Sequence, residues 1–411
     1  MKYFNSKLLS FKEAQQKMQE QLIPVSDYLE LSLFQALGRI TAQPIFSPSN
    51  KPSFDNSAMD GYAVRMNDIT INRVMPIAGT IFAGIPFTGK WPNGSVLRIM
   101  TGAKIPTTCN VVVMQEHIEH CNNGIVITQP VYVGQNIRRM GEEIKINSKV
   151  LSSGTRLGIA ELSLLASLGI KKIHVLRKLR VAILSIGNEL QTLGKSLLEG
   201  KIYDINRFTL MFMLNQLGCE VIDLGIVEDN MQDLCEAFNT GNSVADVVIT
   251  SGGVSVGEMD FTKKILENLG TIILWKLAIK PGKPFLFGQL KNSLFCGLPG
   301  NTVSATVTFY HLVQPMLLRL MGQTDRIYPL RQKARAIDFL KKSPGRLEFQ
   351  RGILSCAKDG VLEVSSTGLQ DSHIFSSFVI GDCFIVLECE RGNVYPGEWV
   401  EIEYFNNLFR R

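Results

Sequence analysis

The spacing of hydrophobic positions changes several times along the chain, and each change indicates a different kind of structure. Apolar residues recur at helical spacing in FKEAQQKMQEQL (11–22) and YLELSLFQALGRI (28–40), and again in IAELSLLASLGI (159–170). We therefore expect two helices within the first 40 residues, and a third helix that packs beside them.

Between these helical pieces, roughly residues 49 to 143, short runs of alternating apolar and polar residues are separated by turn residues. GYAVRM, SVLRIM, NVVVMQEHI and IVITQPVYV are typical of strands. The simplest interpretation is a β-rich domain inserted into a helical one, so that the chain leaves its first domain and later returns to it.

From Lys178 onward, strands and helices alternate. RVAILSIG, CEVIDLGI and ADVVITSGG read as buried strands, and DINRFTLMFMLNQLG, MQDLCEAFNTG and DFTKKILENLG read as helices, before a long apolar helix that follows GLPGN. This order predicts a doubly wound, mostly parallel α/β sheet covered on both faces. Ligand sites in such sheets lie beyond the carboxyl ends of the strands.

After about Tyr328 the pattern returns to short strands joined by Gly, Pro and Asn turns, which predicts a small C-terminal β-barrel. The sequence thus predicts a multidomain α/β plus β protein. Its parts are a discontinuous, elongated helical linker domain (1–48 and 144–177), an inserted β-rich domain (49–143), an α/β domain (178–327) and the barrel (328–411).

Composition agrees with several buried cores, since the 411 residues are 45% hydrophobic and 19% charged. The net charge of +6 is mild for this length, and without a basic arm or zinc-finger spacing it does not favour a nucleic-acid partner. The eight cysteines form no C-x-x-C pair, and no apolar run approaches the length of a membrane span. We expect a cytoplasmic protein with no membrane partner.

The strand-to-helix turn TSGGVSVGEMD (250–260) carries the first candidate chemistry. Its glycines permit close approach of a ligand, its amides and hydroxyls suit phosphate, and a carboxylate follows near the helix start. The candidate residues are Ser251, Gly252, Gly253, Ser255 and Asp260. An ordinary helix cap with a tight turn is the alternative, and the spacing is not that of a P-loop.

Other strand ends carry further candidates. Carboxylates follow strands or open helices at Glu189, Asp204 and Asp229, and lysines surround a Pro-Gly turn at Lys276, Lys280 and Lys283. Carboxylates suit a hard cation such as Mg²⁺, and lysines suit phosphate or another oxyanion. The turn GLPGN adds Pro299 and Gly300, for which a purely structural role is nearly as good an explanation.

The segment FDNSAMDGY (54–62) raises a separate question. Either it is a solvated turn, or it presents Asp60 to a ligand while Gly61 lets the backbone approach closely. The segment alone leaves both interpretations open.

Eight segments in order resemble a known family. FDNSAMDGYAV, RIMTGA, GQNIRRMGEEI, TSGGVSVGEMD, KLAIKPGKP, GLPGN, PGRLEFQRG and SHIFSSF are similar to the MoeA family of molybdopterin molybdenumtransferases, which includes the gephyrin E-domain. The segments span about residues 50 to 380, and the domain plan is similar as well. The resemblance therefore implies a molybdopterin-binding fold for the α/β domain.

The resemblance implies a reaction in molybdenum cofactor biosynthesis: molybdate and adenylylated molybdopterin are the substrates, Mg²⁺ is the cofactor, and AMP is released. It implies a homodimer whose active-site cleft combines domains of both subunits. It also suggests molybdopterin adenylyltransferase and apo-molybdoenzymes as partners. Two alternatives remain: a scaffold or binding module with a vestigial pterin site, and a molybdopterin adenylyltransferase.

Site residues follow from the resemblance position by position. The catalytic set is Asp60, Glu189, Asp260, Lys276 and Lys280. The metal set is Glu189, Asp229 and Asp260, and the residues expected to bind the cofactor substrate are Thr101, Ser251, Gly252, Gly253, Ser255, Pro299, Gly300, Arg351 and Ser372.

Four positions depart from the family pattern: Glu143, Asn188, Thr302 and Asp371. Thr302 replaces a proline and restores an N–H, and Asp371 adds a negative charge beside the expected molybdate site. The main carboxylates and lysines are retained.

Overall fold

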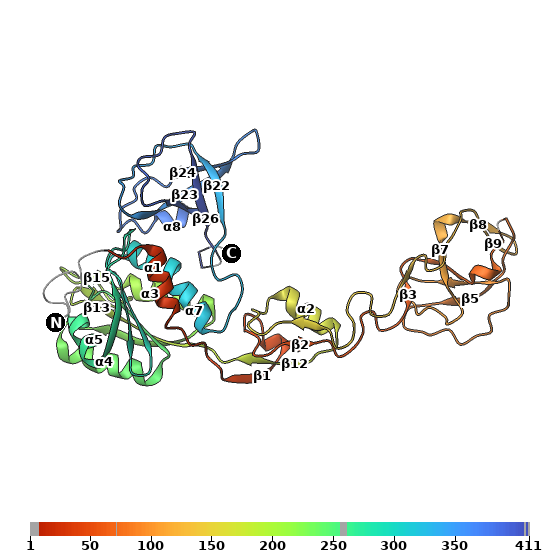
Figure 1. The fold of residues 1–411 in the computed structure, drawn as a ribbon, viewed down its shortest axis with the longest axis horizontal. Coiled ribbons are helices and arrows are strands. Elements are labelled where there is room, and N and C mark those ends of the chain that lie inside the picture. The colour runs from red at the N-terminus through yellow and green to blue at the C-terminus, as the bar shows by residue number, and fades with distance from the viewer. Residues whose placement is uncertain (1–7, 71, 255–260, 407, 410–411) are drawn as a thin grey trace.

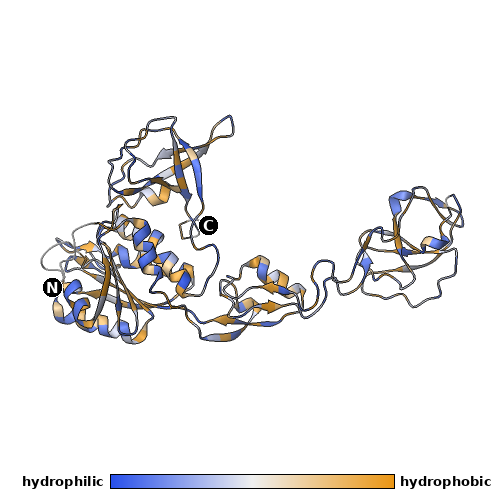
Figure 2. Ribbon diagram, viewed as in Figure 1, coloured by the Kyte–Doolittle hydropathy of each residue, from blue (hydrophilic) through white to orange (hydrophobic). Residues whose placement is uncertain are grey.

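The computed structural model describes residues 8–70, 72–254, 261–406 and 408–409. The chain is elongated, with an α/β body, a C-terminal barrel beside that body, a narrow linker, and a β-rich domain at the far end (Figure 1). Figure 2 shows hydrophobic residues along the strands of the α/β sheet and hydrophilic residues on much of the helices' outer surface. In the described part of the chain, no helix has the length and apolar character needed to span a membrane.

The narrow linker is built from segments that lie more than 100 residues apart in the sequence. β1 (Tyr28–Ser32) pairs antiparallel with β12 (Lys172–Leu176), and β2 (Ile45–Phe46) pairs with β11 (Lys149–Leu151). α2 (Ile159–Ser167) and the 3-10 turn η1 (Leu33–Gln35) lie on these strands. Their shared core is Ala36, Leu157, Leu165, Ile173 and Val175.

Two expectations for the N-terminal helices were wrong. Residues 28–40 form β1 and η1 rather than a helix, because β1 finds a partner strand in β12, and leucine spacing alone cannot anticipate such pairing. α1 (Phe11–Gln19) forms as predicted, with a capping box between Ser10 and Glu13. However, its buried Ala14 and Met18 belong to the core of the α/β body, so α1 does not pack beside α2.

The β-rich domain contains a four-stranded sheet with hydrophobic clusters on both faces. The strand order is β5 (Ile77–Ile81), β6 (Val96–Ile99), β4 (Gly61–Val64) and β7 (Val111–Met114). Shorter elements complete it: the pair β3 (Asn56–Ser57) and β10 (Ile137–Arg138), the hairpin β8 (Ile118–Cys121) and β9 (Gly124–Ile127), and the 3-10 turns η2 (Met66–Asp68) and η3 (Gln115–His117).

The α/β body has a six-stranded sheet. Its order is β16 (Glu220–Val227), β13 (Arg180–Ile186), β17 (Val247–Ser251), β21 (Leu294–Leu298), β20 (Leu286–Leu290) and β18 (Gly270–Trp275). The first four strands are parallel, and β20 is antiparallel to both of its neighbours. The predicted mostly parallel sheet is confirmed. The hairpin of β20 and β21 was not foreseen.

Helices cover both faces of this sheet. One face packs against α1, α3 (Ile205–Leu217), α6 (Thr302–Thr308), the π-helical turn η4 (Phe309–Val313) and α7 (Gln314–Leu320). The other face packs against α4 (Met231–Val244) and α5 (Phe261–Leu269). A short parallel pair, β14 (Leu190–Gln191) and β15 (Ile202–Tyr203), follows the carboxyl end of β13.

The C-terminal domain is a small barrel, as predicted. Its strands are β22 (Arg331–Ala336), β23 (Leu347–Cys356), β24 (Leu362–Ser366), β25 (Cys383–Leu387) and β26 (Trp399–Tyr404), and α8 (Ser377–Ile380) precedes β25. Pairing of β23 with β25 closes the barrel. β19 (Ile279–Lys280), which comes from the α/β body, extends the sheet by pairing in parallel with β23.

Candidate functional site

A hollow of about 510 Å³ lies at the carboxyl ends of β13, β17 and β21. This is the position expected for a ligand in a parallel α/β sheet. Ten of its lining residues are polar or charged: Ser185, Glu189, Tyr203, Asp204, Asn206, Asp229, Ser251, Asn301, Thr302 and Ser304. We call this hollow the carboxylate cavity.

Two glycines shape the floor of the carboxylate cavity. Gly252 and Gly253 have φ values of +84° and +69°, and a Cβ at Gly252 would lie 2.4 Å from the carbonyl oxygen of Ile186. Only glycine fits both the backbone conformation and this close approach. Pro299 and Gly300, which were predicted to bind the cofactor substrate, line the same cavity.

Asn206 joins the two glycine turns. Its Nδ2 donates to Ser251 Oγ (2.7 Å) and to the carbonyl oxygen of Gly300 (2.6 Å), so the turn after β17 and the turn after β21 are tied together. Asn206 lies in the first turn of α3, and its place after Asp204 in the sequence was the only available signal of this role. Ser251 is thereby held in place within the cavity wall.

Glu189 and Asp229 both line the carboxylate cavity. Burial and the charge of Glu189 raise the pKa of Asp229. A Cβ at Gly187 would lie 2.6 Å from Glu189 Oε2, so the glycine lets this carboxylate fold back over the turn. Asn188 Oδ1 accepts a hydrogen bond from the backbone N–H of Asp229 (3.2 Å). Two neighbouring carboxylates of this kind suit a hard divalent cation.

Of the other predicted carboxylates, Asp204 also lines the carboxylate cavity, but it is paired within the protein. Asp204 caps α3 and accepts hydrogen bonds from Ser185 Oγ (2.8 Å) and Arg207 Nε (2.8 Å), so its charge is neutralised within the protein. Asp260 and Ser255 lie outside the described residues. Within the described residues, no three His, Cys, Asp or Glu side chains gather as a metal cluster.

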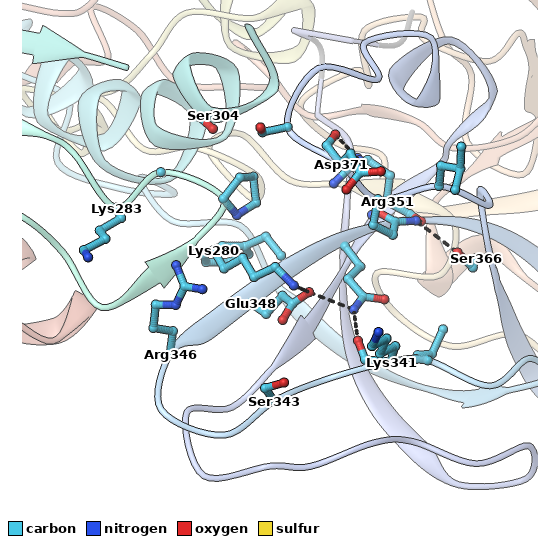
Figure 3. A pocket seen from close by; sticks show the side chains of 18 of the residues that line it. Lys280, Lys283, Ser304, Lys341, Ser343, Arg346, Glu348, Arg351, Ser366 and Asp371 are labelled. Carbon is cyan, nitrogen blue, oxygen red and sulfur yellow. Dashed lines mark hydrogen bonds and ion pairs between the residues drawn. The ribbon is translucent and has the colours of Figure 1, made fainter. Parts of the chain in front are cut away.

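A second hollow, of about 730 Å³, lies between the α/β body and the barrel (Figure 3). Its basic lining residues are Lys280, Lys283, Lys341, Arg346 and Arg351, and its acidic ones are Glu348 and Asp371. We call it the cationic cavity. Pro284 and Ser304 line both cavities, and Asn301 Nδ2, at the rim of the first, donates to Ser372 Oγ at the rim of the second (3.0 Å).

Arg351 is fully buried in the wall of the cationic cavity. Its Nε donates to Ser377 Oγ (2.9 Å) and its Nη2 to the carbonyl oxygen of Asp371 (3.4 Å), whereas its Nη1 has no partner among the residues that the structure describes. Burial lowers the pKa of Arg351 to about 10, so the guanidinium still carries its charge at neutral pH. An unpaired, buried N–H donor of this kind is suited to an oxyanion.

Lys280 lines the cationic cavity, and its Nζ lies 3.0 Å from Glu348 Oε1. Lys276 does not line either cavity. It has a positive φ of 69°, and its Nζ lies 4.7 Å from the centroid of the Trp275 ring. Lys283, the third lysine around the Pro-Gly turn, lines the cationic cavity.

Asp60 and Thr101 lie together in the β-rich domain. The backbone N–H and the hydroxyl of Thr101 donate to Asp60 Oδ1 (2.7 and 2.8 Å), and these two bonds lower the pKa of Asp60. Neither residue lines the cavities, because their domain lies at the opposite end of the chain (Figure 1). Gly61 packs on β7, where a Cβ would lie 2.0 Å from the Val113 oxygen, so its role is sheet packing.

The four departures from the family pattern lie in different places. Asp371 and Thr302 line the cationic and the carboxylate cavity respectively, and Asn188 holds the turn at Asp229. Glu143 lies away from both cavities and forms an ion pair with Lys51 (3.3 Å). The sequence pattern did not indicate four residues of the cationic cavity, because nothing in a strand pattern shows which face borders a cavity. They are Lys341, Arg346, Glu348 and Gln350.

Three family models match consecutive parts of the chain. The MoeA N-terminal region (domain I and II) matches residues 9–169, a probable molybdopterin binding domain matches residues 182–319, and the MoeA C-terminal region (domain IV) matches residues 333–405.

Known proteins are similar over nearly the whole length. A molybdopterin molybdenumtransferase of Haemophilus influenzae is 52% identical over 402 residues, covering 98% of this chain and 100% of the relative. Gephyrin of Dictyostelium discoideum is 32% identical over 93% of this chain and 60% of its own length. The crystal structure of a molybdopterin biosynthesis MoeA protein from Pyrococcus horikoshii OT3 matches with a TM-score of 0.83 at 26% identity, covering 97% of this chain and 100% of that one.

Proposed function

The chain belongs to the MoeA family and is a molybdopterin molybdenumtransferase of molybdenum cofactor biosynthesis, and we propose that it inserts molybdenum from molybdate into adenylylated molybdopterin with release of AMP and with Mg²⁺ as cofactor. Hydrolysis of the phosphoanhydride yields AMP and leaves the phosphate on the pterin. The single observation that carries the proposal is the pair of adjoining cavities of opposite character, which share Pro284 and Ser304.

The carboxylate cavity is the proposed site of the nucleotide and pyrophosphate end of the substrate. The glycine turns at Gly252 and Gly300 bring backbone close to the ligand, and Asn206 fixes them relative to each other. Close backbone approach is what a pyrophosphate site requires. Positioning of the anhydride would be the main contribution of these residues.

Mg²⁺ fits the residues of the carboxylate cavity. Glu189 and Asp229 offer oxygen ligands, and burial, followed by the charge of Glu189, raises the pKa of Asp229. Asp260 is the third proposed ligand. The ion would neutralise pyrophosphate charge and polarise the anhydride when it is bound.

The cationic cavity is the proposed site of molybdate. Arg351 offers its unpaired Nη1, Lys280 offers ammonium donors, and Ser372 lies at the rim that joins the two cavities. Two cationic groups and a hydroxyl are suited to a tetrahedral dianion. The adjoining position would bring the oxyanion near the dithiolene of a substrate bound across both cavities.

Asp60 and Thr101 are proposed to act in the cleft of a partner subunit. In one chain they lie far from the cavities, yet Thr101 holds Asp60 ionised and oriented at the surface. The linker also exposes apolar side chains such as Phe34 and Ile159, which are 99% and 79% exposed. A homodimer would cover such surface and would bring the far domain of one subunit to the cavities of the other.

One reaction tests the proposed function. The purified chain is mixed with adenylylated molybdopterin, Mg²⁺ and molybdate, and AMP release and activation of an apo-molybdoenzyme are followed. The proposal expects both. Absence of both would favour a scaffold with a vestigial site. In a separate reaction that contains ATP and unmodified molybdopterin, consumption of ATP would indicate an adenylyltransferase.

A further inference from the structure

Glu348 is a buried carboxylate in the wall of the cationic cavity. It is 3% exposed, and the other charged residues that line the cavity are five basic side chains and the exposed Asp371. A carboxylate in this position repels an anionic ligand and is costly to bury. Its presence therefore calls for a function that offsets both effects.

The contacts of Glu348 are specific (Figure 3). Its Oε1 accepts from Lys280 Nζ (3.0 Å) and from Gln350 Nε2 (2.9 Å). Gln350 is also 3% exposed, and its Nε2 donates a second bond to the carbonyl oxygen of Lys341 (2.9 Å). The Gln350 amide is thus fixed between Glu348 and the backbone, and it fixes the carboxylate in turn.

Lys280 and Glu348 come from different domains. Lys280 lies on β19 of the α/β body and Glu348 on β23 of the barrel, and the two are direct partners in the parallel pairing of these strands. The Lys280 side chain is 46% exposed and flexible, whereas that of Glu348 is 4% exposed. The rigid partner therefore determines where the mobile ammonium lies.

We propose that Glu348 is a positioning residue: it holds the Lys280 ammonium at the cationic cavity and leaves the remaining N–H donors of Lys280 to the incoming oxyanion. One N–H of the ammonium bonds to Glu348, which leaves two donors for molybdate. This inference rests on the proposed function, because it assigns Lys280 to the molybdate site.

Positioning and charge have opposite consequences. The orientation of Lys280 favours the reaction of bound molybdate, and the negative charge of Glu348 weakens the binding of molybdate itself. Loss of the charge alone should therefore tighten molybdate binding and slow turnover. If Glu348 only stabilised the pairing of β19 with β23, loss of its charge would not tighten molybdate binding while slowing turnover.

The test compares Glu348→Gln with Glu363→Gln in the full-length chain. Glu348→Gln keeps the shape and an acceptor oxygen but removes the charge, and Glu363, which pairs with Arg335 at 2.9 Å on β24 and does not line the cavity, is the matched control. We expect the molybdate Kd of Glu348→Gln to fall about threefold or more, kcat to fall about tenfold, and KM for adenylylated molybdopterin to stay unchanged. Glu363→Gln should match the wild type.

A double-mutant cycle with Lys280→Met asks whether Glu348 acts through Lys280. In the Lys280→Met background, Glu348→Gln should lower kcat no further. An equal loss of kcat in both backgrounds would overturn the inference.

If Glu348→Gln does not fold, Glu348→Asp provides the test. It keeps the charge but withdraws the carboxylate from Lys280, so kcat should fall at an unchanged molybdate Kd; unchanged kcat would contradict the inference. A wild-type chain that neither releases AMP nor inserts molybdenum would refute the proposed function itself. An active wild type with Glu348→Gln indistinguishable from Glu363→Gln would refute only the role of Glu348.

Discussion

Thr101 donates two hydrogen bonds, from its backbone N–H and its hydroxyl, to the same oxygen of Asp60. A carboxylate that accepts two such bonds stays ionised and keeps one orientation at an exposed position. Its other oxygen remains available to a ligand.

Thr101→Val should therefore impair the reaction without unfolding the domain. The valine keeps the backbone bond but removes the hydroxyl bond, so the pKa of Asp60 should rise and the acid limb of the pH profile of kcat/KM should move to higher pH. We expect activity near neutral pH to fall on the order of tenfold to a hundredfold. Thr80→Val, at an exposed position of the same sheet, is the control, and an unshifted acid limb would contradict the assigned role.

Asp229→Asn should stabilise the chain when Mg²⁺ is absent. The pKa of Asp229 is raised in the folded state, so its ionisation opposes folding. The free energy of unfolding therefore begins to fall as the pH rises above the pKa that Asp229 has in the unfolded chain. At neutral pH the neutral amide removes this cost, and Tm should rise by about 1 °C, because the group is exposed.

Added Mg²⁺ distinguishes a metal ligand at Asp229 from a surface carboxylate that does not bind the ion. Mg²⁺ should raise the Tm of the wild type and of the neighbouring control Glu228→Gln, but not that of Asp229→Asn. The proposed metal site would be wrong if the Asp229→Asn variant gained as much from Mg²⁺ as the wild type.

Gly252→Ala should destabilise the α/β body more than Gly225→Ala. Both glycines have a positive φ, +84° and +81°, but a Cβ at Gly252 would lie 2.4 Å from the Ile186 oxygen, whereas no atom of the described residues lies within 4 Å of a Cβ at Gly225. Backbone strain alone costs about 1 kcal/mol, and the clash at Gly252 should add about 1–3 kcal/mol. Chemical denaturation measures the free energy of unfolding of both variants. If the two variants lost the same free energy of unfolding, the turn after β17 would relax freely around the added methyl group.

Asp371→Asn should tighten molybdate binding. Asp371 lines the cationic cavity and places a negative charge near the expected dianion. Because the side chain is exposed, the gain in affinity should be at most about fivefold and should shrink at high salt. Asp359→Asn, on the same barrel but not at the cavity, is the control; titration calorimetry that finds the two variants alike would leave Asp371 without a role in the site.

Much of the fold could be predicted because its signals are local. The alternation of strands and helices after Lys178 predicted the mostly parallel sheet, and with it the edge at which Glu189, Asp229 and Gly252 meet. The wrong helix at 28–40 has the opposite cause, because β1 exists only through a partner strand that begins at Lys172.

The cationic cavity could be predicted only in part. Lys280 and Arg351 were found through the family motifs, but Glu348 reads as an ordinary strand residue until β19 pairs with β23 and places it against Lys280. Lys276 shows the converse, because its motif suggested the site, but the residue lines neither cavity. Contacts between domains are what the sequence pattern does not contain.

The most direct test of the account is whether Asp60 and Arg351 act in one cleft from two different subunits. Asp60→Asn and Arg351→Met chains, each inactive alone, are unfolded or dissociated together, mixed in equal amounts and reassociated, and AMP release is measured. Half of the dimers should then be mixed, and each mixed dimer should contain one intact cleft, so about a quarter of the wild-type activity should return. If each cleft used residues of a single chain, every cleft in the mixture would carry a defect and no activity would return.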